Sequence, residues 1–215
     1  MIRYDRNFQR LAFCLAALAG FVDAIGFLKS GGLFVSFMSG NTTRLAIGIF
    51  EVAASAVAAA TLIALFVIGV FLSLVVTAKV MVAHRKVVAM ACVAVLLVAA
   101  ALSQIAGYDY PTTGLLCLAM GATNTVFHRD GEVSIGVTYM TGTLVKLGGR
   151  LADAALGGDR TAWRPYLLLW LALLAGGAFG AASYRWSPVA SICLAAAAAL
   201  VLVRVAHWLT RGVSS

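Results

Sequence analysis

Six stretches of this chain are apolar over 16 to 23 residues, and no other feature restricts its fold as strongly. An α-helix rises about 1.5 Å per residue, so runs of roughly 20 apolar residues match the ~30 Å hydrocarbon core of a bilayer. The predicted spans are Leu11–Leu28, Ala56–Ala78, Val87–Ala106, Thr112–Phe127, Tyr166–Tyr184 and Val189–Val205. We therefore expect an all-α integral membrane protein, with one transmembrane domain over residues 1–215.

Composition excludes several other classes of protein. The chain is 62% hydrophobic and only 11% charged, whereas soluble domains average about 25% charged residues. Its net charge of +8 comes from basic residues scattered between apolar runs, which is typical of membrane loops rather than of nucleic-acid binding. The four cysteines have no metal-ligand spacing, and we find no catalytic triad, paired-carboxylate or phosphate-loop pattern. We expect no enzyme activity, cofactor, metal or nucleic-acid partner.

The two halves of the chain repeat one another. Residues 34–45 match residues 136–147 at a constant offset of 102 positions. The matched pairs include Met38 with Met140, Gly40 with Gly142, Arg44 with Lys146, Leu45 with Leu147, and Glu51 with Asp153. With one residue of slippage upstream, Asp23 matches Asn124. We predict an internal duplication, with repeat one at residues 11–106 and repeat two at 108–206, so the first span is retained rather than cleaved as a signal peptide.

Each repeat also contains a segment of mixed character, Leu33–Phe50 in the first and Val133–Leu156 in the second. Both open with β-prone alternation and continue as a Gly-containing helix. If these segments are re-entrant, each repeat has three spans and the two repeats are inverted. If they cross fully, the chain has eight spans and the repeats are parallel.

Basic residues distinguish the two topologies, because cytoplasmic loops are enriched in Lys and Arg. In the re-entrant topology one side holds Arg3, Arg6, Arg10, Lys79, Arg85, Lys86, Arg129, Arg150, Arg160, Arg164, Arg204 and Arg211, and the other holds only Lys29 and Arg185. The eight-span topology divides the same residues eight against six. We therefore predict two inverted repeats of three spanning helices, each with a re-entrant strand and half-helix, and both termini in the cytoplasm.

Short polar and Gly residues open both predicted half-helices. Such residues cap helix N-termini, whose free N–H groups and positive dipole ends bind anions. The predicted substrate-binding residues are Ser39, Gly40, Asn41 and Thr42 in repeat one and Thr141, Gly142 and Thr143 in repeat two. The alternative is that both caps lie at a membrane surface.

Arg44 and Lys146 occupy matched positions one turn inside these helices, and a cation is costly at membrane depth. We include both in the predicted substrate site. The alternatives are that they extend to the membrane interface or pair with Glu51 and Asp153.

Asp23 is the only acidic residue deep within a predicted span, and Asn124 matches it without the charge. An intramembrane carboxylate suits a proton or cation relay, so this pair is the predicted coupling site. Asp23 could instead serve a structural role, by bonding to neighbouring helices or capping the broken segment.

Three segments resemble signature segments of the YoaK family of bacterial inner-membrane proteins. They are Ala19-Gly-Phe-Val-Asp-Ala-Ile-Gly-Phe27, Phe37-Met-Ser-Gly-Asn-Thr-Thr43 and Tyr139-Met-Thr-Gly-Thr-Leu144. The resemblance spans nearly the whole chain and implies a multi-pass protein of the bacterial inner membrane, but no substrate. At the level of architecture only, the strand and half-helix element also resembles larger inverted-repeat anion and nucleobase transporters.

These observations predict a secondary transporter of a small polar or anionic solute, with a proton-coupling role for Asp23. Sites of such transporters lie near the bilayer midplane, where broken helices converge. A passive channel using the same site and a non-transporting scaffold or assembly factor are the alternative functions. The expected partners are the lipid bilayer and the solute, and the sequence leaves a homodimer open.

Overall fold

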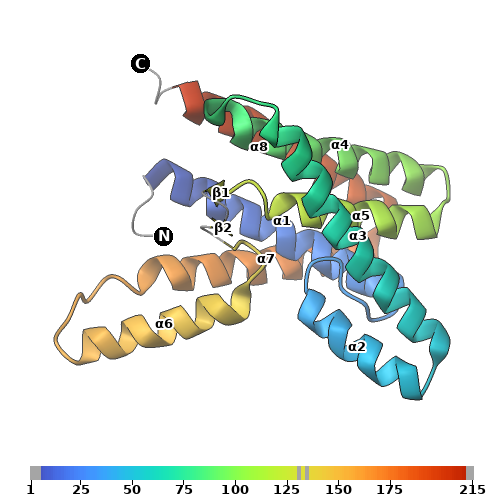
Figure 1. Ribbon diagram of the computed structural model, residues 1–215, viewed down its shortest axis with the longest axis horizontal. Coiled ribbons are helices and arrows are strands. Elements are labelled where there is room, and N and C mark those ends of the chain that lie inside the picture. Colours follow the sequence, from blue (N-terminus) through green and yellow to red (C-terminus); the bar gives the residue numbers. More distant parts are fainter. Residues whose placement is uncertain (1–5, 130–131, 134–135, 212–215) are drawn as a thin grey trace.

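Helices account for nearly all of the part of the chain that the structure describes (Figure 1). The structure, a computed structural model, describes residues 6–129, 132–133 and 136–211. Its helices are α1 (Arg6–Ser30), α2 (Met38–Phe50), α3 (Ala53–Ala78), the 3-10 turn η1 (Val82–His84), α4 (Arg85–Ile105), α5 (Asp109–Thr123), α6 (Met140–Ala155), α7 (Arg164–Trp186) and α8 (Pro188–Arg211). The predicted all-α class is confirmed, with one small hairpin in addition. Arg3 lies outside the described residues.

Five of these helices are long and apolar enough to cross a membrane. They are α1, α3, α4 together with η1, α7 and α8, with 23 to 26 residues in each candidate span. Each matches one of the predicted spans, although α4 ends one residue before the predicted end at Ala106, so the chain is a multi-pass membrane protein. α1 is the most enclosed of the five and packs against α5, α7 and α8.

The sixth predicted span, at residues 112–127, is shorter than expected. α5 has 15 residues, about 22 Å of helix, and ends at Thr123. Beyond it, Asn124 Nδ2 donates a hydrogen bond to the Met120 carbonyl, and Thr125 Oγ1 donates one to the Ala122 carbonyl. Asn and Thr side chains that bond to nearby backbone compete with helix continuation. The helix therefore stops four residues before the predicted end.

The two Gly-containing helices are short and run in opposite directions. α2 has 13 residues and α6 has 16, about 20 and 24 Å, and neither is among the candidate spans. In Figure 1, α2 runs from the middle of the molecule toward the right end, and α6 runs from the middle toward the left end. α2 packs on α3, and α6 packs on α7.

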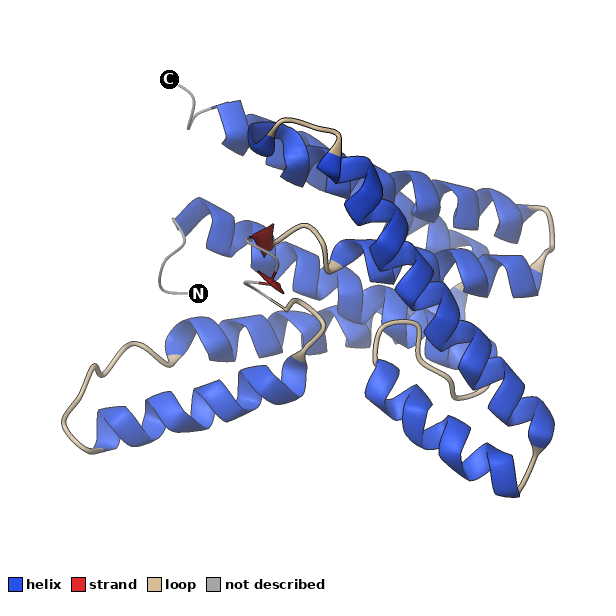
Figure 2. Ribbon diagram, in the orientation of Figure 1, coloured by secondary structure: helices blue, strands red, loops and turns tan. Residues whose placement is uncertain are grey.

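The segments that precede these two helices differ from each other. In the second half, β1 (His128–Arg129) pairs with β2 (Glu132–Val133) as an antiparallel hairpin, which Figure 2 shows in red. Residues 31–37 form turns without a strand. The predicted β-prone start of the first segment is therefore wrong. Its Gly31-Gly32 pair has positive φ angles of 72° and 118°, a conformation that turns the chain back after α1.

Several connections between helices lie at one of two ends of the molecule. In Figure 1 the start of α1, the end of α8, the α3–α4 connection and the α6–α7 connection lie toward the left. The α2–α3 and α4–α5 connections lie toward the right. This arrangement places the connections that contain Lys79 and Arg160 at the same end of the molecule.

α1 and α7 cross at close range through small residues. A Cβ atom on Gly20 would overlap the backbone carbonyl of Leu173, and one on Gly176 would overlap that of Ala17. Gly180 lies similarly against the carbonyl of Phe21. Such small-residue contacts let helix backbones approach closely inside a membrane.

α3 and α5 cross in the same way. A Cβ atom on Gly121 would overlap the backbone carbonyl of Phe66, and one on Gly69 would overlap that of Leu118. Gly121 follows Gly20 by 101 positions, and Gly176 follows Gly69 by 107. The two crossings thus use residues that match between the halves of the chain.

Candidate functional site

Asp23 ties the first mixed segment to the last third of α1. Its Oδ1 accepts hydrogen bonds from the backbone N–H groups of Val35, at 2.9 Å, and Ser36, at 2.7 Å. The side chain of Val35 packs against Gly26, where a Cβ atom would overlap it. No Lys or Arg of the described residues forms an ion pair with the Asp23 carboxylate. Asp23 therefore holds the chain just before α2, and its carboxyl group has no basic partner among the described residues.

Asn124 occupies the equivalent position in the second half. Its Oδ1 accepts a hydrogen bond from Thr138 Oγ1 at 2.9 Å, and Asn124 and Thr138 are both buried. Thr138 follows Ser36 by 102 positions, which is the offset of the repeat. Both halves therefore fasten the residue two positions before a half-helix to a polar side chain, which lies on α1 in the first half and directly after α5 in the second.

The half-helices begin one or more residues earlier than the predicted caps. α2 starts at Met38 with Phe37 as its N-cap residue, and α6 starts at Met140 with Tyr139 in that role. Neither N-cap side chain bonds to the helix. The prediction that polar side chains cap these helices is wrong, because the polar residues lie within the first turns.

The hydroxyl and amide groups of these turns bond largely to their own backbone. Asn41 is fully buried, accepts the N–H of Phe34 at 2.9 Å and donates to the Phe34 carbonyl at 2.6 Å. Thr42 Oγ1 donates to the Met38 carbonyl, and Thr143 Oγ1 donates to the Tyr139 carbonyl. Asn41 therefore shapes the loop before α2, rather than presenting a free amide.

Backbone N–H groups remain available at both helix starts. Within the described part of the chain, no acceptor bonds to the N–H of Ser39, or to those of Thr141 and Gly142. Ser39, Thr141 and Gly142 are also exposed. The first turn of a helix carries such unpaired donors together with the positive end of the dipole. Both starts can thus bind an anion or a polar acceptor.

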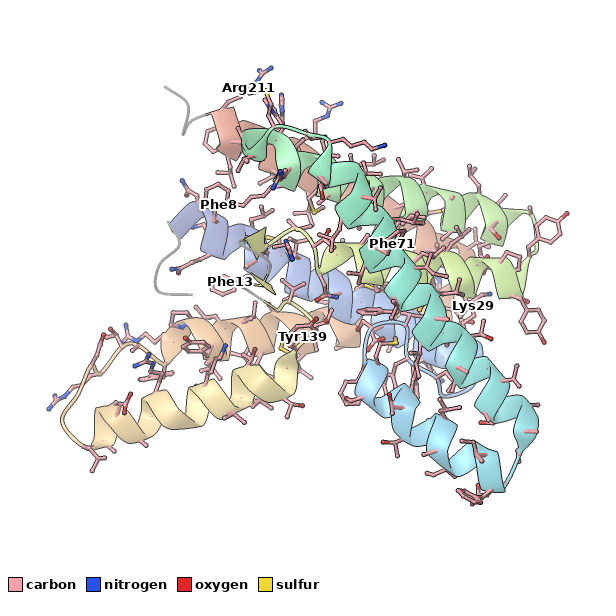
Figure 3. All side chains as sticks on the ribbon, viewed as in Figure 1. Phe8, Phe13, Lys29, Phe71, Tyr139 and Arg211 are labelled. Carbon is pink, nitrogen blue, oxygen red and sulfur yellow. The ribbon has the colours of Figure 1, made fainter. Side chains whose placement is uncertain are left out.

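The two glycines of the predicted site have different surroundings. A Cβ atom on Gly40 would overlap the ring of Phe37, whereas a Cβ atom on Gly142 would have no neighbour within 4 Å. Tyr139, labelled in Figure 3, lies one turn before Gly142. The start of α6 is therefore the more open of the two.

Arg44 and Lys146 are both exposed, but they have different neighbours. Arg44 lines a pocket of about 370 Å³ beside α2 with Gly40 and Glu51. In α6, Asp153 pairs with Arg150 at 3.2 Å. Lys146 forms no ion pair with Asp153 among the described residues, so that alternative is not found.

The predicted site residues lie in two groups. One lies around α1 and α2, the other around α5 and α6, and α1 packs on α5 between them. The half-helices themselves do not pack on each other within the described residues. The pocket that contains Gly40 is not lined by Asp23. The opposed directions agree with the sequence prediction, while a shared cavity remains a prediction.

A family model described as "Protein of unknown function (DUF1275)" matches residues 11–206. The chain belongs to the DUF1275 family. It is also 37% identical over 212 residues to the UPF0700 transmembrane protein RA0705 of Rhizobium meliloti (strain 1021), covering 95% of this chain and 91% of that protein. No solved structure matches. Family membership and the transmembrane relative agree with the membrane fold.

This DUF1275 chain also has a charged pair that sequence reasoning missed. Lys29, in the last turn of α1, donates a hydrogen bond to Asp109 at the start of α5. This contact holds the pKa of Asp109 below its usual value. The two residues are 80 positions apart. The available signal was that each is a lone charge at the end of a helix.

Among the described residues of this DUF1275 protein, no group of three or more His, Cys, Asp or Glu side chains is placed to hold a metal ion. The four cysteines are free thiols. The groups that could bind a ligand are therefore backbone N–H donors, hydroxyls and the few charged side chains.

Proposed function

We propose that this protein is a secondary transporter of a small polar or anionic solute, built from two inverted repeats. The observation that carries the proposal is the pair of half-helices. α2 and α6 begin in the middle of the molecule, run toward opposite ends, and are too short to cross a bilayer (Figure 1). Broken helices of this kind form the substrate sites of secondary transporters.

Matched contacts support the inverted repeats. The α1–α7 and α3–α5 crossings use equivalent glycines, and Asp23 and Asn124 fasten equivalent loops. Each crossing joins one helix from each repeat. α1 of the first repeat meets α7 of the second, and their counterparts α5 and α3 meet in the same way. An inverted duplication explains why α2 and α6 run in opposite directions, because equivalent helices of two inverted repeats point in opposite directions.

The N-termini of α2 and α6 are the proposed binding groups for the solute. The unpaired N–H groups of Ser39, Thr141 and Gly142 would donate to it. Each helix dipole would contribute roughly 0.3 to 1 kcal/mol to anion binding. Arg44 and Lys146, one turn further along each helix, would add long-range attraction. Movement of one half against the other would then expose the solute to each side in turn.

Asp23 is the proposed coupling residue. Its carboxylate accepts two backbone N–H groups and has no basic partner among the described residues. A proton is therefore the charge that can neutralise it at membrane depth. Neutralisation would weaken its bonds to Val35 and Ser36 and release the start of α2.

The proposed location is the bacterial inner membrane, with both termini in the cytoplasm. The clustering of basic loops at one end of the molecule supports this orientation. The resemblance of residues 19–27 and 37–43 to the YoaK family supports the location. The inner-membrane location and the cytoplasmic termini are both proposals that go beyond family membership.

A scaffold function is the second candidate, and one observation favours it. Asp23 and Asn41 are both engaged in holding the loop before α2. On that view these residues maintain the fold, and the chain moves no solute.

Flux measurements in reconstituted vesicles test the proposal. Uptake of isotopically labelled chloride, sulfate, phosphate, acetate and a neutral polyol would be followed, because a proton that moves with a monovalent anion carries no net charge. We expect saturable uptake of at least one anion, with faster exchange when the same anion is present on the other side. Uptake that rises linearly with concentration and shows no exchange indicates a channel, and absence of uptake for every probe supports the scaffold.

A matched pair of variants locates the site. Gly142→Val places a side chain in open space at the start of α6, and Gly148→Val does so further along the same helix, where no neighbour lies within 4 Å. The first should raise the half-saturating anion concentration at least tenfold, and the second should leave it unchanged. Equal effects would contradict a site at the helix start.

A further inference from the structure

A large crevice lies at the end of the molecule opposite the start of α1 and the end of α8. Its volume is about 800 Å³, within the usual range for ligand pockets. The end of α1, the first half of α3, and the start of α5 form its walls, with Tyr184 of α7. Lys29, at the right of Figure 3, marks its position. The proposed transport site does not use this crevice.

Lys29 contributes a buried cation with unused hydrogen-bond donors. Its side chain is only 5% exposed. An ammonium group has three N–H donors, and within the described residues Lys29 donates only to Asp109. Because buried donors are normally satisfied, the remaining two call for an acceptor that the described side chains do not supply.

The negative charge of Asp109 lies nearer the surface of the molecule than the ammonium group of Lys29. Its side chain is 72% exposed and lies in the first turn of α5, where the helix dipole favours a carboxylate. Next to it, Tyr110 is 93% exposed, as expected for an aromatic residue at a membrane interface. The crevice therefore has a buried positive charge and an outer negative charge.

The rest of the crevice is largely apolar. Leu33, Leu62 and Leu65 line it together with small residues of α3. Val57, on the same wall, is 66% exposed and faces the surroundings of the helix bundle. A ligand that fills this space needs an acceptor for Lys29, an N–H donor for Asp109, and an apolar chain.

We propose that this crevice binds a phospholipid with a phosphoethanolamine headgroup. The phosphate accepts hydrogen bonds from Lys29, the ammonium donates to Asp109, and an acyl chain lies along Leu62 and Leu65. The order of the charges fits, because the phosphate of such a lipid is nearer the glycerol and the ammonium lies further out. This inference does not depend on transport.

The ammonium group distinguishes this lipid from a close analogue. Phosphatidylcholine carries the same phosphate and the same net charge, but its trimethylammonium group has no N–H donor for Asp109. Loss of one charge-assisted hydrogen bond corresponds to about a tenfold loss of affinity. We therefore expect the chain to retain phosphatidylethanolamine about tenfold better than phosphatidylcholine with the same acyl chains.

Native mass spectrometry of the full chain in detergent, titrated with each dioleoyl lipid, measures this preference. Asp109→Asn should reduce the preference between headgroups, and Lys29→Gln should weaken binding of both lipids. Arg185→Gln is the control, because Arg185 is an exposed cation at the end of α7 and does not line the crevice. Thr61→Phe fills the crevice without touching the charged pair, so it should expel lipid even if Lys29→Gln fails to fold.

Three results would overturn the proposal. They are equal retention of both lipids by the unmodified chain, a headgroup preference unchanged by Asp109→Asn, and lipid binding unaffected by Thr61→Phe. Free phosphoethanolamine distinguishes a soluble ligand from a lipid. If it competes with the lipid at equal concentration, the crevice takes a soluble zwitterion and the lipid assignment is wrong.

Discussion

The carboxylate of Asp23 accepts the backbone N–H of Ser36 at 2.7 Å. Asp23 lies seven residues before the end of α1 at Ser30, about 10 Å along the helix axis. The chain must therefore return about that far alongside α1 before α2 begins. Backbone at membrane depth is tolerated only where protein or enclosed water satisfies it, and this bond supplies one such partner.

Asp23→Asn should abolish solute movement and leave the fold intact. The amide keeps an oxygen that can accept the N–H groups of Val35 and Ser36, as Asn124 does for Thr138, but it cannot take up a proton. The measurements are flux in vesicles and thermal unfolding in detergent. Normal flux at every pH would remove Asp23 from the coupling mechanism.

Asp23→Leu is the companion variant. It leaves two backbone N–H groups without their acceptor, at about 1 to 3 kcal/mol for a buried unsatisfied group. Unfolding should therefore occur at a clearly lower temperature than in Asp23→Asn. Equal stability of the two variants would mean that the bond to Ser36 does not anchor the loop.

Five of the six predicted spans and the positions of α2 and α6 were predictable, because run length and internal matching are properties of the local sequence. Met38 and Met140 begin helices at matched positions for that reason. The cap residues were not predictable in the same way. Bonds from Val35 and Ser36 to Asp23 cross at least 12 positions and set where the chain turns, so Phe37 rather than Ser39 precedes the helix.

Gly176→Ala should destabilise the protein, although alanine favours helices. The new Cβ atom would overlap the carbonyl of Ala17, so α1 and α7 must separate, and overpacking typically costs about 1 to 3 kcal/mol. Gly148→Ala is the control, because its Cβ atom would have no neighbour within 4 Å. That variant should gain up to about 1 kcal/mol. Thermal unfolding in detergent measures both, and the same shift in both would contradict the close crossing.

The Lys29–Asp109 pair should make stability depend on pH. Lys29 lowers the pKa of Asp109 in the folded protein, so the pair stabilises the fold above the unfolded pKa of about 3.9. That stability is lost as the pH falls through the lower folded pKa. The difference in melting temperature between the unmodified chain and Asp109→Asn should therefore be constant near neutral pH and shrink in acid. In a Lys29→Gln background this pH dependence should disappear, and its persistence would assign it to another group.

Surface labelling tests the proposed orientation. In a cysteine-free background, a membrane-impermeant maleimide added outside cells should modify Tyr110→Cys, in the α4–α5 end of the molecule, where Tyr110 is 93% exposed. It should spare His84→Cys in η1. Reaction at position 84 in intact cells would reverse the orientation that the basic loops predict.

Long-range contacts limited the prediction of the sites. Lys29 and Asp109 carry no local pattern that pairs them, since they meet only when the ends of α1 and α5 pack together. The end of α5 at Thr123 was missed for a related reason, because Asn124 turns toward Thr138 fourteen positions away. The sequence therefore predicts which segments carry candidate site residues more reliably than which side chains in those segments contact each other.

Water accessibility of the two half-helix starts tests the central claim most directly. Single cysteines at Ser39, Thr141 and Phe71 would be exposed, in membranes open on both sides, to a small charged thiol reagent. Ser39 and Thr141 lie at the starts of α2 and α6, while Phe71 is 62% exposed within the span α3. We predict rapid reaction at positions 39 and 141 and none at 71, because the half-helices start in a polar cavity within the membrane. If positions 39 and 141 react only after the protein is unfolded, no such cavity exists and the transporter account is contradicted.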